Sequence, residues 1–161
     1  MNRISIVIPA RNERECLPAV LGELPKDRVR EIIVIDGHST DGTMDLVRDL
    51  GHAAVTQEGR GYGMGVISGI KVAEGELLTF MDADGSYDPD SLPRMLDLID
   101  QGNDIVFCSR YLPEAGSDDD TAIRKLGNGM FTFLLRTMFG VRLSDALFFY
   151  ALGKREVFEA L

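Results

Sequence analysis

Two acidic side chains stand directly after an apolar run and are the strongest candidates for chemistry in this chain. Asp82 and Asp84 follow the segment LLTFM (77–81) and are separated only by Ala83. Two carboxylates this close repel each other, and a divalent cation relieves the repulsion. Carboxylate oxygens suit Mg²⁺ or Mn²⁺, and a bound metal can in turn bind a diphosphate. The pattern predicts a metal site, and the alternative is that Asp84 and Asp88 are turn and cap residues.

Other polar residues also follow an apolar run and are candidates for the same site. Asp36 ends the run EIIVID and can accept hydrogen bonds from a ribose or a base edge. The residues STDGT (39–43) are typical of a turn that caps a helix beginning near Asp41, so we expect them to be structural. His38 either contacts the ligand or is a solvated loop side chain.

Two arginines and a further acid complete the set of candidates. Arg110 follows the run DIVFCS, and Arg124 follows the acidic segment YLPEAGSDDDT (111–121), which we expect to form a loop over the site. Each guanidinium can hold a phosphate through paired hydrogen bonds, or can instead pair with the acids at 118–120. Asp145 precedes the last apolar run and is either a general base or a capping residue.

The glycine-rich stretch GRGYGMGVISG (59–69) matches no standard nucleotide-binding loop. A dinucleotide fingerprint requires GxGxxG, but Val66 stands where the third glycine belongs. A Walker loop requires glycine directly before lysine, but Ile70 separates them. The stretch can still bring backbone N–H groups close to an anion, with Arg60 adding positive charge. Alternatively, the glycines allow a helix to pack closely on a sheet.

These candidates need a scaffold that gathers strand ends at one edge, and the apolar pattern predicts such a scaffold. Runs of strand length lie at 4–10, 31–36, 53–56, 76–82, 104–110 and 147–152. Helical spacing of apolar residues occurs at Leu17, Val20, Leu21 and Leu24, and again at Leu92, Met95, Leu96 and Ile99. The expected helix boundaries are marked by the caps Asn12 and Asp90, the first-turn prolines Pro18 and Pro93, and the terminal glycines Gly51 and Gly102.

Apolar strands that alternate with helices predict an α/β fold. Near-continuous apolar strands are typical of a mostly parallel sheet that helices cover on both faces. Ligands bind such sheets beyond the carboxyl ends of the strands. Because Asp36, Asp82 and Arg110 all follow predicted strands, we expect the site at that edge.

Composition narrows the class of protein. A length of 161 residues, 45% of them hydrophobic, indicates one domain with one core. A formal net charge of −9 argues against binding of nucleic acid. The sequence contains no membrane-spanning run and no signal peptide, so a cytoplasmic location is expected. Cys16 and Cys108 lack the spacing of a zinc site. Nothing in the sequence indicates an oligomeric state.

A very apolar helix is predicted at MFTFLLRTMFG (130–140). Burial in the core is its first explanation, because the fold needs helices with wide apolar faces. The alternative is a surface helix that meets lipid or a lipid-linked acceptor, which would place the protein at the cytoplasmic face of a membrane.

Four segments together resemble the family 2 glycosyltransferases, and in particular the branch that contains the dolichol-phosphate mannose and glucose synthases. They are SIVIPARNERECLPAVL, EIIVIDGHSTDGTMDLV, GRGYGMGVISGIKVAEGELLTFMDADGSYDPDSLPRML and DIVFCSRY, and they occur in the family's order over nearly the whole chain. The resemblance implies the GT-A fold, a Rossmann-like nucleotide-binding α/β domain. It also implies metal-dependent transfer, with inversion, of a hexose from a nucleoside-diphosphate sugar such as GDP-mannose or UDP-glucose to a sugar or a polyprenyl phosphate.

The resemblance assigns roles to individual residues. Asp82 and Asp84, with Ala83 between them, correspond to the family's DxD motif, and Ser86 stands where that branch places a third residue near the metal. Arg110 and Arg124 correspond to arginines that hold phosphate groups of donor or acceptor. The family's nucleotide-binding contacts fall on Pro9, Ala10, Arg11, Glu13 and Asp36.

The chain also departs from the family pattern. Gly37 stands where a second acid usually follows Asp36, and ALFFYAL (146–152) replaces a TSGFR-like acceptor signature. The sequence stops at KREVFEAL, where family catalytic domains usually continue, so residues 1–161 are expected to form a single catalytic domain, either trimmed or incomplete. Two alternatives to a glycosyltransferase remain: a non-catalytic module that binds nucleotide sugars, and a nucleotidyltransferase, which would need a basic glycine-rich opening loop that this chain lacks.

Overall fold

The computed structural model describes residues 3–112 and 121–160. The chain divides into two compact units. The first, which we call the sheet unit, comprises Met1–Val106 and Ala151–Leu161. The second, the helix unit, comprises Phe107–Tyr150. The loop predicted at 111–121 lies mostly outside the described residues, which stop at 112 and resume at 121. The acids at 118–120, which were predicted as alternative partners of the arginines, lie wholly outside them.

The described residues form a six-stranded sheet in the order β3-β2-β1-β4-β6-β5. Parallel pairing joins β1 to β2, β1 to β4 and β2 to β3, whereas β6 runs antiparallel to β4. The prediction of an α/β fold with a mostly parallel sheet is therefore confirmed. The strands are β1 (Ile4–Ala10), β2 (Val29–Asp36), β3 (Ala53–Thr56), β4 (Leu77–Phe80), β5 (Ile105–Phe107) and β6 (Ala151–Lys154).

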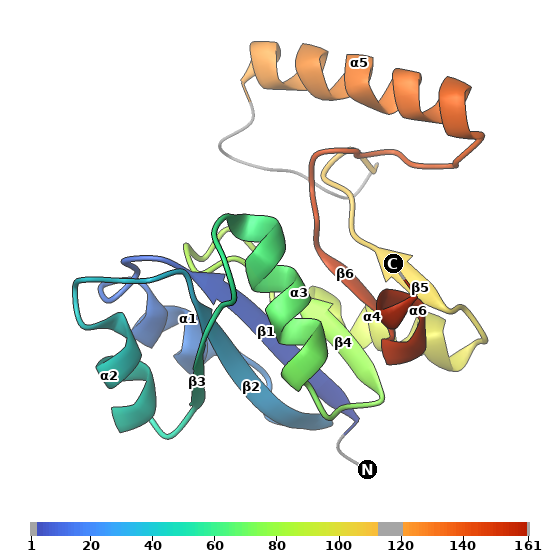
Figure 1. The fold of residues 1–161 in the computed structure, drawn as a ribbon. Coiled ribbons are helices and arrows are strands. Elements are labelled where there is room, and N and C mark those ends of the chain that lie inside the picture. Colours follow the sequence, from blue (N-terminus) through green and yellow to red (C-terminus); the bar gives the residue numbers. More distant parts are fainter. Residues whose placement is uncertain (1–2, 113–120, 161) are drawn as a thin grey trace. The chain divides into compact units, whose positions relative to one another are not determined.

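Helices connect these strands and cover both faces of the sheet. Figure 1 shows α3 in front of the strands and α4 behind them. The helices are α1 (Leu17–Glu23), α2 (Thr43–Asp49), α3 (Tyr62–Val72), α4 (Ser91–Asp100), α5 (Ala122–Phe139) and α6 (Arg155–Glu159).

The core lies where the predicted apolar faces meet. All residues of β1 except Pro9 are buried, as are all four residues of β4, because these two strands are central in the sheet. The two predicted helical stripes are also confirmed, since Leu17, Val20, Leu21 and Leu24 are buried, and so are Leu92, Met95, Leu96 and Ile99.

The helix boundaries agree with the prediction at the prolines and glycines but differ at the caps. Gly51 and Gly102 follow α2 and α4 with positive φ of 82° and 102°. Asn12 is not a cap, because α1 begins only at Leu17. Asp90 occupies the N-cap position of α4 without a side-chain hydrogen bond, and Asp88 instead accepts one from the Ser91 hydroxyl at 3.0 Å.

The last strand lies later in the chain than its apolar run suggested. The predicted strand at 147–152 is wrong for Leu147 to Tyr150, since β6 begins at Ala151. In the observed register Leu152 pairs with Thr79 and Gly153 with Leu78. Leu147, by contrast, is 57% exposed. Apolar character was similar throughout this run, and only pairing with β4 selected which residues became strand.

The glycines of α3 allow this helix to approach the sheet closely. A Cβ on Gly69 would overlap Cγ1 of Val7, and one on Gly65 would lie 3.1 Å from Cβ of Pro9. Both glycines therefore face β1, and the packing alternative holds for them. Gly61, which precedes the helix, has a φ of 94° and belongs instead to the loop at its start.

Gly69→Ala is expected to lower the free energy of unfolding by about 1–3 kcal/mol, because the added methyl group must displace Val7 in a filled core. Gly63→Ala in the same helix is the matched control. A Cβ there meets no atom within 4 Å, so this variant should be neutral or more stable by up to about 1 kcal/mol. Chemical denaturation measures both, and equal stability of the two variants would contradict the packing account.

Candidate functional site

A cavity of about 620 Å³ opens at the carboxyl edge of the sheet unit. It lies beside the ends of β1 and β4, between which the order of strands along the chain changes direction. Open α/β sheets bind their ligands at this kind of switch point. The cavity is lined by Pro9, Ala10, Arg11, Glu13, Gly37, His38, Gln57, Arg60, Gly61, Tyr62, Asp82, Ala83 and Asp84.

The two predicted metal ligands both line this cavity. Asp82 and Asp84 follow β4, and the Asp84 carboxylate accepts a hydrogen bond from the Ser86 backbone N–H at 2.9 Å. Ser86 itself is exposed and is not a lining residue, so its predicted role near a metal stays a prediction.

Two tyrosines surround the Asp82 carboxylate. Burial raises the pKa of the Tyr62 and Tyr87 phenols, and the negative charge of Asp82 together with its hydrogen bonds to both hydroxyls raises it further. Both phenols therefore stay protonated at neutral pH. The influence of Asp82 on both pKa values shows that the two tyrosines lie close to one of the two acids of the pair.

The donor set at this cavity fits a hard divalent cation. The described residues contain no group of three or more His, Cys, Asp or Glu side chains that could by itself hold a metal. Mg²⁺ sites that serve phosphate chemistry commonly use one or two protein carboxylates, and substrate phosphates and water supply the remaining ligands. Asp82 and Asp84 satisfy that requirement.

Two cations share the cavity with these acids. Arg11 and Arg60 both line it, and neither forms an ion pair within the described ranges 3–112 and 121–160. In a chain of net charge −9, arginines without an acidic partner are notable, because carboxylates are abundant. The cavity therefore combines two carboxylates with two positively charged side chains.

The loop after β1 is held in place by the turn after β2. The Asn12 N–H donates to the Ser39 hydroxyl (2.9 Å), and the Thr40 N–H donates in return to Asn12 Oδ1 (2.8 Å). The Arg14 N–H donates to Asp41 (3.2 Å), whose carboxylate also caps Thr43. The structural interpretation of STDGT is confirmed by these contacts, which position the Arg11 and Glu13 loop.

Asp36 lies next to the cavity but does not line it. Its side chain is buried, and both carboxylate oxygens lie 3.2 Å from the Ser39 N–H. The following residues, Gly37 and His38, are the ones that line the cavity, and His38 Nε2 also lies 2.9 Å from the Gly59 carbonyl oxygen. The contact of Asp36 with a ribose or base stays a prediction.

Sequence reasoning missed two lining residues. Gln57 directly follows β3 and is buried, so the same strand-end rule that selected Asp82 would have found it. Tyr62 is the first residue of α3, and only its place in the cavity beside Asp82 shows why it matters. No local signal in the sequence distinguishes Tyr62 from an ordinary surface tyrosine.

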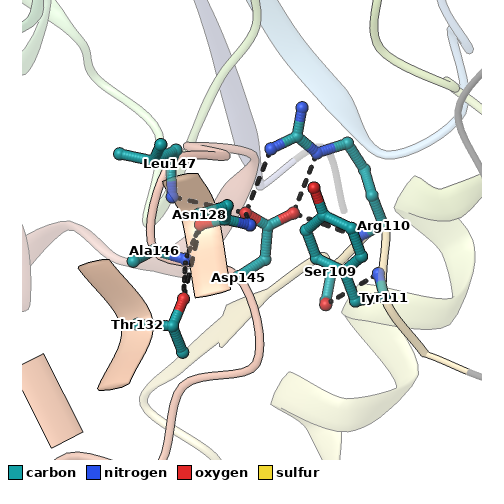
Figure 2. A network of polar contacts seen from close by, with 8 residues as sticks. All are labelled: Ser109, Arg110, Tyr111, Asn128, Thr132, Asp145, Ala146 and Leu147. Carbon is teal, nitrogen blue, oxygen red and sulfur yellow. Dashed lines mark hydrogen bonds and ion pairs between the residues drawn. The ribbon is translucent and has the colours of Figure 1, made fainter. Parts of the chain in front are cut away.

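The remaining candidates lie in the helix unit, where Arg110 and Asp145 form an ion pair (Figure 2). Arg110 Nε donates to Asp145 Oδ2 at 2.8 Å, and Nη2 donates to Oδ1 at 3.1 Å. Asn128 of α5 donates to the same carboxylate at 2.7 Å. The side chain of Asp145 is fully buried, which favours the capping interpretation of this residue over that of a base.

The electrostatic environment of Asp145 keeps it ionised. Burial by itself raises the pKa of its carboxyl, but the hydrogen bonds from Arg110 and Asn128 and the positive charge of Arg110 outweigh burial. The pKa therefore lies below the ordinary value of an aspartate. A carboxylate with a lowered pKa is a weaker proton acceptor.

Arg124 occupies the first turn of α5. Its backbone N–H donates to the hydroxyl of Thr121, which is the N-cap residue of this helix. The alternative that Arg110 or Arg124 pairs with the acids at 118–120 concerns residues outside the described part of the chain.

Comparison with known proteins identifies the family. The profile of Glycosyl transferase family 2 matches residues 5–161. The chain belongs to this glycosyltransferase family. The polyprenol monophosphomannose synthase of Mycolicibacterium smegmatis is 33% identical over 175 aligned residues, which cover 99% of this chain and 64% of that protein. A Mycobacterium tuberculosis protein described as an uncharacterized glycosyltransferase is 36% identical over 113 residues, or 70% of this chain and 50% of the relative.

Solved structures confirm the GT-A glycosyltransferase fold. Glucosyl-3-phosphoglycerate synthase from Mycobacterium tuberculosis in complex with uridine diphosphate superposes with a TM-score of 0.78 at 22% identity, over 99% of this chain and 59% of that one. The same enzyme with Mn²⁺, UDP-glucose and phosphoglyceric acid gives a TM-score of 0.76 at 21% identity, with the same coverage. This family member spans roughly half to two thirds of the length of the curated relatives named above.

Asp145→Asn is expected to lower the free energy of unfolding by roughly 3 kcal/mol at pH 7, because it removes the buried negative charge that forms the ion pair with Arg110. The native pKa of Asp145 is lowered, so the ion pair stabilises fully above the unfolded-state pKa of about 3.9. That stabilisation is lost as the pH falls through the lower native pKa. The free energies of unfolding of the wild type and of Asp145→Asn, measured by denaturation between pH 7 and pH 2, should therefore become equal in acid.

Asp97→Asn is the matched control for this measurement. Asp97 is exposed on α4 and forms no ion pair among the described residues, so its replacement should change stability little at any pH. If the difference in free energy of unfolding between wild type and Asp145→Asn stayed constant down to pH 2, the ion pair would not be the cause of that difference.

Proposed function

We propose that this chain is the catalytic part of an inverting, metal-dependent glycosyltransferase that moves a hexose from a nucleoside-diphosphate sugar to a polyprenyl phosphate. One observation carries the proposal: a single cavity at the switch point of the sheet is lined by Asp82 and Asp84 and by two arginines, Arg11 and Arg60, that form no ion pair with any residue in 3–112 or 121–160. A divalent cation matches the acids, and a diphosphate matches both the cation and the arginines.

The donor would occupy this cavity. Arg11 and Arg60 supply positive charge for its phosphates, and Pro9, Ala10 and Glu13 shape the wall at the end of β1. Asp82 and Asp84 would hold Mg²⁺ or Mn²⁺, with Ser86 as the third residue that the family resemblance assigns. The crystallised relative that binds Mn²⁺ and UDP-glucose supports this choice of ligands.

The bound metal would act as a Lewis acid on the leaving diphosphate, whose negative charge increases as the glycosidic bond to it breaks. The protein groups contribute by orientation. Tyr62 and Tyr87 lie close to the Asp82 carboxylate, and the hydrogen bonds between the 12–14 loop and the 39–43 turn hold Arg11 at the cavity. Fixed charges of this kind need no reorganisation during the reaction.

The acceptor end would use the helix unit. Arg110 and Arg124 are proposed to hold the phosphate of a polyprenyl phosphate, which is already anionic and therefore needs no general base. The polyprenol monophosphomannose synthase among the relatives supports this acceptor class. A hydroxyl acceptor would need a base, and Asp145, whose carboxylate is buried and ion-paired, is poorly suited to that role.

Helix α5 supports action at a membrane surface. The prediction of core burial for residues 130–140 is wrong, because Met130 is 57% exposed, Phe133 64% and Met138 71%, and Ile123 and Leu126 earlier in the helix are exposed as well. Residues 121–144 contain the cations Arg124, Lys125, Arg136 and Arg142 and no acid, although the chain as a whole is acidic. An exposed apolar face with flanking cations matches the surface of an anionic bilayer.

Peripheral contact with the bilayer is the mode that we propose. Among the described residues, no helix combines the length and the hydropathy that crossing a membrane requires. A lipid phosphate acceptor would meet α5 at the membrane surface, and the expected location at the cytoplasmic face is part of this proposal.

A transfer assay with Mn²⁺, GDP-mannose or UDP-glucose, and short polyprenyl phosphates tests the catalytic claim. Transfer of the hexose to the lipid phosphate is expected. Binding of the donor without turnover on any acceptor would favour the non-catalytic module instead.

Asp84→Ala is expected to abolish metal-dependent binding of UDP or GDP while the fold is retained, because one of the two carboxylates proposed to bind the cation is lost. Calorimetric titration of the nucleotide in the presence of Mn²⁺ measures this. Asp90→Ala is the control, since Asp90 is exposed in the same loop region and does not line the cavity. Unchanged affinity in Asp84→Ala would count against the metal site.

Leu126→Asp is expected to weaken binding to vesicles of phosphatidylglycerol at least about tenfold, because a buried leucine contributes roughly 1.5–3 kcal/mol and a charge in its place opposes insertion. Sedimentation with vesicles measures the bound fraction. Leu98→Asp is the matched control, because Leu98 is a partly exposed leucine on α4 of the sheet unit. Equal losses in both variants would contradict docking through α5.

A further inference from the structure

A buried carboxylate in the helix unit is engaged more completely than a cap requires. Asp145 Oδ1 accepts hydrogen bonds from Arg110 Nη2, from Asn128 and from the Leu147 N–H, while Oδ2 accepts from Nε and from the backbone N–H of Arg110. Two of these five come from the side chain of a single arginine. The carboxylate therefore determines the orientation of that guanidinium as well as the path of the chain.

The guanidinium of Arg110 is also placed against two aromatic rings. Its Cζ lies 4.9 Å from the centroid of the Phe148 ring and 5.6 Å from that of Tyr111. The paired hydrogen bonds define the plane of the guanidinium, and the rings restrict its position further. A flexible arginine is in this way converted into a group with a fixed direction.

A second layer of contacts fixes the carboxylate. Asn128 donates to Asp145 through its amide nitrogen, and its amide oxygen accepts from the Ala146 N–H at 3.1 Å and from the Thr132 hydroxyl at 3.3 Å (Figure 2). Asn128 and Thr132 are both buried in α5. Because both ends of the Asn128 amide are used, its orientation is defined, and so is that of the carboxylate next to it.

We propose that Asp145 is a positioning residue for Arg110: with Asn128 behind it, the carboxylate holds the guanidinium in the one orientation in which it receives the acceptor phosphate, and Asp145 does not act as a base. This inference deepens the proposed function and rests on the role of Arg110 given there. Phosphate recognition by arginine depends on the direction of its planar fork, so loss of orientation costs affinity even when the charge remains.

The first test is NMR of the arginine Nε–H groups in the full chain. In the wild type the Nε–H of Arg110 should exchange slowly with water, whereas that of Arg136, which is exposed and forms no ion pair among the described residues, provides the fast reference. Asp145→Asn and, more weakly, Asn128→Ala should abolish the protection. Protection that survives in Asp145→Asn would overturn the inference, whatever the acceptor is.

The second test is binding of geranyl phosphate, measured by calorimetry on the wild type, Arg110→Ala, Asp145→Asn and the double variant. Asp145→Asn should weaken binding about tenfold, the order expected when a charge-assisted hydrogen bond is lost. If Asp145 acts through Arg110, the double variant should bind no more weakly than Arg110→Ala alone. Full additivity of the two losses, or unchanged binding in Asp145→Asn, would overturn the inference.

The pH profile of transfer separates positioning from proton acceptance. Asp145→Asn should lower the rate without changing the shape of the profile, whereas loss of a base would remove its acidic limb. A purely structural role would lower stability and leave the affinity for geranyl phosphate unchanged. If the wild type does not bind geranyl phosphate, the proposed acceptor class is wrong, and the exchange of the Arg110 Nε–H then decides the positioning inference by itself.

Discussion

The parallel pairing of β1 with β4 is the constraint on which the candidate site depends. Ile4 pairs with Leu77 and Val7 with Phe80, so the two strands end at the same edge of the sheet. Pro9 and Ala10 at the end of one strand thus come next to Asp82 and Asp84 beyond the other, although more than 70 residues separate them. Gly65 and Gly69 of α3 maintain this arrangement, because any larger side chain would push the helix away from β1.

The charged side chains of the two units are arranged differently. In the cavity of the sheet unit, Arg11 and Arg60 form no ion pair with the described residues, and Asp82 and Asp84 line the same cavity, so these charges are available for the proposed cation and anionic ligand. In the helix unit, Arg110 and Asp145 neutralise each other within the protein. The first arrangement is suited to binding, and the second to holding a group in a defined direction.

Helix α5 reverses the usual distribution of polar and apolar residues. Its buried side carries Asn128 and Thr132, which bind Asp145 and Ala146, while leucine, isoleucine and methionine face outward. The polar side is satisfied by hydrogen bonds within the helix unit. The proposed contact of the apolar side with an anionic bilayer rests on this exposed face and on the flanking cations of α5.

The sequence by itself determined the elements whose signals are local. The buried stripes of α1 and α4, the run that became β1 and the position of Asp82 and Asp84 after β4 could all be read from apolar periodicity, because burial and helical or extended geometry impose that period on neighbouring residues. The family resemblance, confirmed by the match over residues 5–161, extended this to the fold as a whole.

Only the tertiary structure decided the features that depend on distant partners. It placed β6 at Ala151 and not at Leu147, assigned Gly65 and Gly69 to packing, brought Tyr62 to Asp82, and joined Arg110 to Asp145 across 35 positions of the chain. The apolar face of α5 was likewise misassigned to the core. Periodicity indicates that one face of a helix is apolar, but it does not indicate what covers that face. Strand register and long-range packing determine that cover, and they also determine which donor meets a given carboxylate. Neither leaves a local signal in the sequence.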